Sequence, residues 1–186
     1  MCNPASFVIL KSGEVLFGKY HDSHEEIIRE NKLTDTDSVK FVRVEISPPN
    51  NNYRLPLTKW QYQRDQDLVP EWYNDKWGET LCQSALPRWA KTHIYKTGSH
   101  KFSNGLFNLI FMGSAQAKIS GQTGGDVWGY GNAQITSSGQ TGGYVWGYDN
   151  AQIIITAEIA GNNGDPLPPN YREYDEQENI IPSRNA

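Results

Sequence analysis

Cysteines and long apolar runs are scarce in this sequence of 186 residues. The two cysteines, Cys2 and Cys82, provide neither a disulfide framework nor, by themselves, a zinc site. No run approaches the roughly 18 apolar residues that a membrane-spanning helix requires, and the N-terminus lacks the basic and apolar regions of a secretory signal. The net charge is only −4. We therefore expect a cytoplasmic protein of one or two domains that contacts no membrane and carries no cofactor and no metal.

What the sequence does contain is repetition. Beginning at Gly113, three consecutive segments align without a gap: GSAQAKISGQTGGDVWGY, GNAQITSSGQTGGYVWGY and DNAQIIITAEIAGNNGDP. A fixed period is typical of solenoids, in which each repeat forms one coil and buries its inner face only against its neighbours. The 18-residue period divides into three sixes, which favours a triangular β-helix with one short strand on each side. We expect a short, three-coil β-helix over residues 103–160.

Stacking of equivalent positions predicts ladders of side chains on these coils. Adjacent rungs are about 4.8 Å apart, so aromatic side chains at equal positions cover each other. Such aromatics either staple coil to coil or form a flat contact surface for a sugar, a base or another protein, and oligomerisation can use the same surface. The predicted aromatic pairs are Trp128 above Trp146 and Tyr130 above Tyr148, beside a ladder of Gln116, Gln134 and Gln152.

The first 102 residues predict a small antiparallel sheet with helices. SFVILK and EVLFG around a two-residue turn are typical of a β-hairpin, FVRVEI alternates as a third strand, and LPLTKWQYQRD gives a fourth. A short helix after the hairpin has the capping-box pattern of Ser23 and Glu26. A second helix is expected to begin near Pro70 and to be interrupted at Pro87, and a third short helix passes through Ile94.

The segment KFSNGLFNLIFM, residues 101–112, links the two parts of the chain. Its Phe and Leu side chains are too bulky for a narrow coil, so we expect them to seal the first coil against the N-terminal domain. Beyond residue 161 the chain is polar and rich in proline, and it cannot bury enough apolar surface to order itself alone. The expected organisation is an α+β domain at 1–102, a β-solenoid repeat region at 103–160 and a flexible tail at 161–186.

Cys2 is the first candidate for chemistry. Removal of Met1 would leave an α-amine beside the thiol, and the amine can act as the base for this nucleophile. The opening MCNPASFVILKSGEVLFGKYHD resembles the start of N-terminal-nucleophile amidohydrolases of the bile-salt-hydrolase type, with a lysine in place of their arginine. The resemblance implies an amidase in which Lys19 and Asp22 occupy the places of the basic and acidic residues. The alternative is that Cys2 is a small N-terminal residue without chemistry.

A second candidate cluster consists of His21, Asp22 and His24. Histidine and aspartate within four residues can supply a base and its orienting partner, or a pair of metal ligands. The same residue types also serve ordinary roles around a helix cap. Further along, the DQD segment at 65–67 and Glu71 concentrate carboxylates but lack the turn glycine of a calcium loop, so helix capping is the simpler interpretation.

The segment RWAKTHIYKTGSHKF, residues 88–102, combines basic and aromatic side chains without an acid. Basic side chains contact phosphates and aromatics stack on unpaired bases, so this mixture is typical of a contact with single strands or RNA. The alternative is a solvated helix face, because so few cations neutralise few phosphates. The residues expected to make the contact are Arg88, Trp89, Lys91, Tyr95, Lys96 and Lys101.

Taken whole, the chain resembles a set of phage and mobile-element accessory proteins. The resemblance rests on MCNPASF, DSHEEII, FVRVEI with the following proline pair, the DQD and PEWY stretch, and the GNAQ-type repeats. It implies a protein that acts in the cytoplasm of an infected bacterium as an inhibitor of host defence, of the anti-CRISPR kind. Its partner would be a host protein or ribonucleoprotein, such as a CRISPR nuclease with its guide RNA. Two alternatives remain open: a hydrolase that uses Cys2, and a glycan-binding or structural repeat protein.

Overall fold

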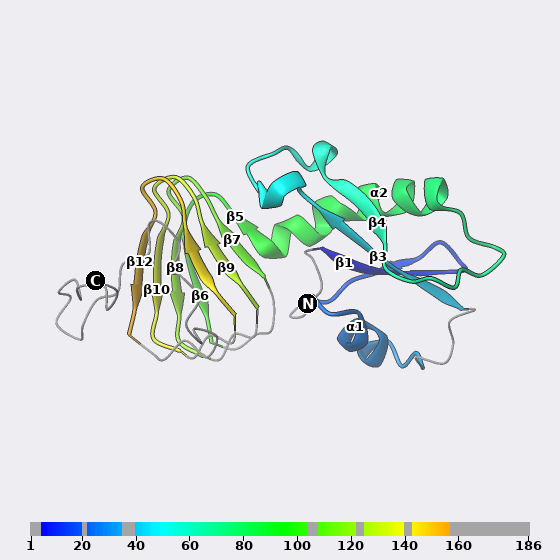
Figure 1. The fold of residues 1–186 in the computed structure, drawn as a ribbon. Coiled ribbons are helices and arrows are strands. Elements are labelled where there is room, and N and C mark those ends of the chain that lie inside the picture. The colour runs from blue at the N-terminus through cyan, green and yellow to red at the C-terminus, as the bar shows by residue number, and fades with distance from the viewer. Residues whose placement is uncertain are drawn as a thin grey trace, which may run out of the picture. The chain divides into compact units, whose positions relative to one another are not determined.

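The computed structural model divides into two compact units, Met1–Thr92 and His93–Ala186 (Figure 1). It describes residues 5–19, 22–34, 40–103, 108–121, 125–139 and 143–156. The sequence placed the division at residue 102, but strands at 94–95 and 99–102 pair with strands of the repeat region. The C-terminal unit therefore begins earlier than expected. The tail predicted at 161–186 lies outside the described residues.

The N-terminal unit is an α+β fold built on one antiparallel sheet, as the sequence predicts. The strands are β1 (Ser6–Leu10), β2 (Val15–Leu16), β3 (Phe41–Ser47) and β4 (Gln61–Arg64). Their order in the sheet is β2-β1-β3-β4. Val8 is in register with both Leu16 and Arg43, so β1 is an inner strand that connects the hairpin to β3.

Helices cover both faces of this sheet, which explains why β1 is apolar on both sides. Helix α1 (His24–Glu30) contributes Ile27 and Ile28 to a buried cluster with Val8 and Phe41. Helix α2 (Asp75–His93) runs along the opposite face in Figure 1. In the described part of the chain, neither helix is long and apolar enough to cross a lipid bilayer.

The start of α1 differs from the predicted capping box. The side chain of Ser23 makes no cap hydrogen bond to the helix backbone. Its Oγ instead donates to Glu25 Oε2 at 2.7 Å, and this hydrogen bond lowers the pKa of the Glu25 carboxyl. Glu26, the expected partner of Ser23, forms an ion pair with Arg29 within the helix.

Helix α2 begins later than predicted and continues through Pro87. The Asn74 Oδ1 accepts a hydrogen bond from the Trp77 amide at 2.9 Å, so Asn74 caps the start that the sequence placed near Pro70. Pro87 removes one backbone donor inside the helix. The fully buried Leu86 beside it anchors the helix in the core. The residues predicted as a third helix continue α2 and then begin a strand.

The C-terminal unit consists of two parallel sheets. One contains β5 (Ile94–Tyr95), β7 (Leu109–Phe111), β9 (Val127–Gly129) and β11 (Val145–Gly147), and the other contains β6 (Ser99–Phe102), β8 (Gln116–Ile119), β10 (Gln134–Ser137) and β12 (Gln152–Ile155). Their orders are β11-β9-β7-β5 and β12-β10-β8-β6. The chain therefore alternates between the sheets, and each new strand pairs with the strand formed two elements earlier.

Equivalent positions of the repeats pair across each sheet, as the 18-residue period predicts. Gln134 is in register with both Gln116 and Gln152, and Trp146 is in register with Trp128. Each sheet contains one additional strand upstream of the recognisable repeats: β5 pairs with β7, and β6 pairs with β8. Two of the three expected strands are present in each of the first two copies, and the described part of the third copy contains one, β12. The third segment, SSGQTG in the second copy, includes residues 140–142, which lie outside the described residues.

The core of the C-terminal unit contains the bulky side chains that we expected at its end. Leu109 and Phe111 are fully buried in the same cluster as the alanines and isoleucines of the repeats. Tyr95 stacks on Phe111 with ring centroids 5.4 Å apart. Phe111 is in register with Gly129, where an added Cβ would lie 3.0 Å from Ile135 Cδ1. Along this row the aromatic Tyr95 and Phe111 of β5 and β7 are followed by Gly129 and Gly147 of β9 and β11. The glycines leave room for the bulky side chains in the same core.

Candidate functional site

A buried polar cluster in the N-terminal unit brings one histidine and two carboxylates together. His24 is the first residue of α1, Glu45 lies in β3, and Asp65 directly follows β4. Their facing nitrogen and oxygen atoms all lie within 4.8 Å of one another. His24 and Glu45 are only 1% and 5% exposed, whereas the side chain of Asp65 is 48% exposed. Solvent therefore reaches the cluster through Asp65.

Two contacts fix the His24 ring. Its Nε2 lies 3.0 Å from the carbonyl oxygen of Val44, and its Nδ1 lies 3.1 Å from Asp65 Oδ2. The backbone amide of Asp65 donates to the carbonyl of Arg43 at 3.0 Å, which holds the carboxylate beside β3. Both neighbours of the ring are acceptors, so both contacts are hydrogen bonds only when the imidazole carries two protons. In the neutral ring with a proton on Nε2, a lone pair on Nδ1 faces the carboxylate.

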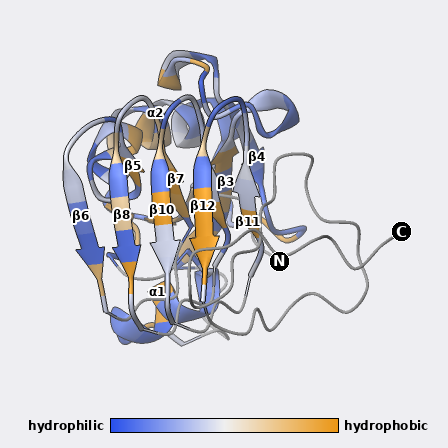
Figure 2. Cartoon of the chain, turned by 90° about the vertical axis from the view of Figure 1, so that its left-hand side faces the viewer, coloured by the Kyte–Doolittle hydropathy of each residue, from blue (hydrophilic) through white to orange (hydrophobic). Residues whose placement is uncertain are grey.

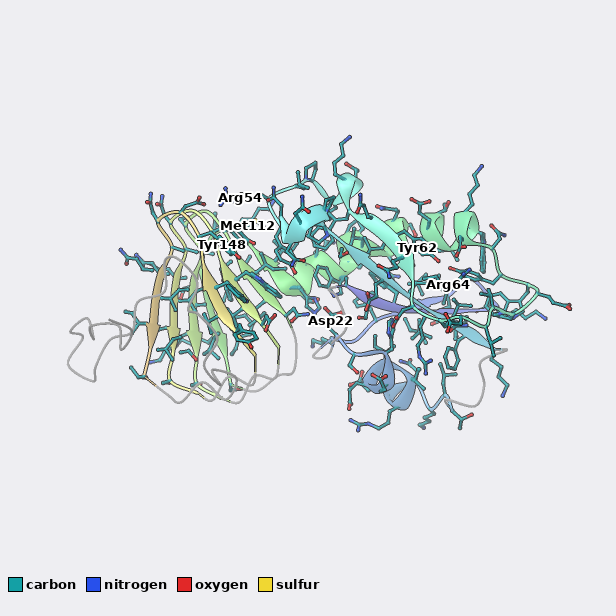
Figure 3. All side chains as sticks on the ribbon, in the orientation of Figure 1. Asp22, Arg54, Tyr62, Arg64, Met112 and Tyr148 are labelled. Atoms are coloured by element: carbon teal, nitrogen blue, oxygen red, sulfur yellow. The ribbon has the colours of Figure 1, made fainter. Side chains whose placement is uncertain are left out.

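This cluster differs from the one that the sequence suggested. Asp22, expected beside His24, lies at the head of β1, where its Oδ1 accepts a hydrogen bond from the Ser6 amide at 2.7 Å (Figure 3). The Ser6 hydroxyl also donates to the Asp22 carbonyl at 3.2 Å. His21 lies outside the described residues. The partners of His24 come from β3 and the end of β4, so proximity in sequence was the wrong guide.

The Cys2 hypothesis concerns a residue outside the described part of the chain, so it stays a prediction. Of the residues assigned to it, Lys19 is exposed after β2, and Asp22 anchors Ser6. The other cysteine, Cys82, is buried in α2, and burial raises the pKa of its thiol to about 12. Because the thiolate is the nucleophile, Cys82 is inert at neutral pH.

A second polar network, which the sequence analysis missed, joins β4 to the start of α2. The hydroxyls of Tyr62 and Tyr73 share a hydrogen bond, and the Tyr62 hydroxyl donates to Asp75 Oδ1 at 3.2 Å. Arg64 Nη1 lies 3.0 Å from Asp75 Oδ2 (Figure 3). Burial raises the pKa of Tyr73 to about 12 and raises that of Tyr62 further. Both phenols are thus neutral near pH 7, and the network holds α2 against the sheet.

The basic and aromatic segment at 88–102 does not form the predicted stacking surface. Trp89 is fully buried and contacts Trp60 with ring centroids 5.8 Å apart. Tyr95 is partly buried against Phe111. The segment is also divided between the two units: Arg88, Trp89 and Lys91 belong to the N-terminal unit, and Tyr95, Lys96 and Lys101 to the C-terminal one.

The aromatic ladders of the repeats are formed but are not an exposed platform. Trp128 and Tyr130 are only 7% and 5% exposed, and Trp146 and Tyr148 are partly buried. The rings of Tyr130 and Tyr148 stack with centroids 4.8 Å apart and planes at 7°. This arrangement therefore favours packing between neighbouring repeats as the role of these rings. So little aromatic surface is exposed that it weighs against a surface that binds glycans.

The four strands β6, β8, β10 and β12 lie side by side in one sheet (Figure 2). The more exposed side chains of this sheet form two rows, and we name them together the glutamine–lysine face. Gln116 Nε2 donates to Gln134 Oε1 at 3.3 Å along one row. Lys101 is in register with Lys118 in the neighbouring row. The four strands contain no aspartate or glutamate. The face consists of Ser99, Gln116, Gln134 and Gln152 in the first row and Lys101, Lys118, Thr136 and Ile154 in the second.

Comparisons of the chain with protein-family models, with curated proteins and with solved structures gave no match. The structure therefore offers two candidate sites on its own evidence: the His24 cluster and the glutamine–lysine face.

Proposed function

We propose that the C-terminal unit is a short β-solenoid and that the chain is a binding protein. In this proposal it inhibits a bacterial host-defence system, in the anti-CRISPR manner, by contacting a protein or ribonucleoprotein target. The observation that carries the proposal is the regular register of the glutamine–lysine face, in which identical polar side chains recur on neighbouring strands. Solenoids extend a recognition surface by this kind of repetition.

The chemistry of the face favours an anionic partner. Lys101 and Lys118 lie side by side in register, and no acid is present in the four strands, although the whole chain carries a net charge of −4. The glutamine amides both donate and accept hydrogen bonds, which suits peptide groups and ribose hydroxyls. The backbone that carries these side chains is already ordered in paired strands, so only side-chain entropy is lost when a partner binds.

The composition of the glutamine–lysine face defines the expected mode of contact. Its eight residues include no aromatic side chain. Base stacking requires open rings, whereas the rings of Trp89 and Trp128 are buried. We therefore expect contacts with phosphates, sugars or an acidic protein surface rather than with unpaired bases. Lys96, exposed between β5 and β6, would extend the positive region of the same unit.

The test is a paired charge reversal. In Lys101→Glu/Lys118→Glu the glutamine–lysine face becomes acidic, whereas Lys59→Glu/Lys76→Glu changes the same number of exposed lysines in the N-terminal unit. Binding of each variant to a purified CRISPR nuclease with its guide RNA is measured by biolayer interferometry at several salt concentrations. We expect the face variant to lose affinity and to lower the salt slope by about one per lysine. Equal effects of the two variants would contradict the proposed surface.

A cellular assay separates inhibition from simple adhesion. Plating efficiency of a sensitive phage is measured on a host that carries an active CRISPR system and expresses each variant. The wild-type chain and the control should restore plating, and the face variant should not. Light scattering of the purified chains tests homo-oligomerisation through the repeats, the other use of this surface.

A further inference from the structure

We infer that His24, Glu45 and Asp65 form a binding site for a divalent transition-metal cation, with Zn²⁺ and Mn²⁺ the best candidates. The site lies wholly within the N-terminal unit, and it does not depend on target binding by the C-terminal unit. Three observations carry the inference: the spacing of the donor atoms, the orientation of the imidazole and the burial of two of the three ligands.

The spacing of the donors suits a shared ion. Ligand atoms bound at about 2.1 Å lie roughly 3.0 Å apart on adjacent octahedral positions and about 3.4 Å apart on tetrahedral ones. The separation of 3.1 Å between His24 Nδ1 and Asp65 Oδ2 falls in this range. The donor atom of Glu45 lies within 4.8 Å of both, which makes it the third ligand of the proposed set.

The orientation of the imidazole is that of a metal ligand. The carbonyl of Val44, 3.0 Å from Nε2, accepts the proton on that nitrogen and leaves the lone pair on Nδ1. A backbone carbonyl that holds the distal N–H in this way is the usual second-sphere partner of a ligating histidine. The Nδ1 lone pair then faces Asp65 Oδ2, and two facing acceptors are stable only when a cation lies between them.

The place between His24 Nδ1 and Asp65 Oδ2 can hold a proton or a metal ion. A proton bridges only these two atoms, whereas a metal ion also reaches Glu45, whose donor atom lies within 4.8 Å of both. His24 and Glu45 are almost fully buried, and buried charged groups are stabilised when they coordinate a metal. We therefore expect the metal ion.

The donor set indicates the class of metal. One imidazole nitrogen suits zinc and iron, and two carboxylates suit manganese, whereas calcium takes oxygen ligands alone. A set without a thiolate disfavours copper(I). Three protein ligands leave at least one position for water or another ligand, and the half-exposed Asp65 provides access from solvent. The three residues come from the DSHEEII, FVRVEI and DQD segments, which are among the motifs on which the resemblance to phage accessory proteins rests.

The experiment uses the full chain after dialysis against EDTA. Zn²⁺ and Mn²⁺ are titrated by calorimetry into the wild type, Asp65→Asn and the control Asp67→Asn, which removes a neighbouring exposed carboxylate. We expect one site in the wild type and in the control, and an affinity at least about tenfold lower for Asp65→Asn. Equal affinities of the two variants, or no binding of either ion, would overturn the inference.

A second measurement requires no variant. Bound Mn²⁺ broadens NMR signals of nearby nuclei, so the amide signals of Val44, Glu45 and Gln66 should disappear first in the wild-type chain. Broadening centred on His100, in the C-terminal unit, would place the ion at a surface histidine and would reject the site.

Discussion

Replacement of Gly139 by alanine tests the stacking of one repeat on the next. A Cβ at this position would lie 2.0 Å from the carbonyl oxygen of Gly121, the equivalent residue of the preceding repeat. Ordinary van der Waals contact begins near 3.4 Å, so the two backbones must move apart until the new methyl group fits between them. The amides of Ser138 and Gly139 donate to the carbonyl of Ile119 at 2.8 and 3.3 Å. Loss of these two hydrogen bonds would cost about 1–3 kcal/mol.

The assay is urea unfolding combined with hydrogen exchange read by mass spectrometry. We expect Gly139→Ala to unfold at lower urea and to lose amide protection in peptides that contain β8 and β10. Peptides of the N-terminal sheet serve as an internal reference. Ser138→Ala, an exposed change at the preceding residue, should leave both measurements unaltered. Unchanged protection in Gly139→Ala would refute the close approach of the repeats.

Two further predictions concern buried titratable groups. Burial raises the pKa of Asp126 above its ordinary 3.8, although its Oδ1 accepts a hydrogen bond from the Tyr144 amide at 2.8 Å. Its contribution to stability is therefore greatest below pH 3.8 and is lost as the pH rises through the folded-state pKa. Asp126→Asn keeps the acceptor, so it should be more stable than the wild type at pH 7 and no more stable at pH 3, as measured by urea unfolding. Burial also raises the pKa of Cys82 to about 12, so iodoacetamide should label this thiol at pH 8 only in urea. Peptide mass spectrometry separates Cys82 from Cys2, and rapid labelling of Cys82 in the native chain would contradict its burial.

The pairing of the repeats was predictable because equivalent positions carry the same letters at a fixed period, as with Trp128 and Trp146. The pairing of β5 and β6 was not predictable, because these strands lack the Gln and Trp of the repeats and pair with the next strands at shorter spacings. Ile94 pairs with Ile110, and Ser99 with Gln116. The bulky Phe111 also looked incompatible with a narrow core, since the sequence does not show that glycine occupies the paired position.

The partners of His24 could not be predicted from the sequence for a different reason. Proximity favoured Asp22 as the partner of His24, whereas the register of the sheet brings Glu45 and Asp65 to it. The sequence does contain one indication of a buried polar cluster. Glu45 is a single carboxylate in the otherwise apolar end of FVRVEI. An acid at 5% exposure in a central strand indicates a polar environment inside the fold, and the histidine at the start of α1 lies within 4.8 Å of it.

The in-register pairing of the repeats has an evolutionary consequence. The copies that begin at Gly113 and Gly131 are identical at 13 of 18 positions, so unequal recombination between them would insert or delete one complete copy as a unit. Each repeat pairs only with its neighbours, and an inserted copy would offer the same hydrogen bonds on both sides. The stack of repeats would lengthen by about 4.8 Å for each inserted copy, and the new copy would replace the contacts that it separates. One genetic event could therefore lengthen the glutamine–lysine face without changing the rest of the molecule.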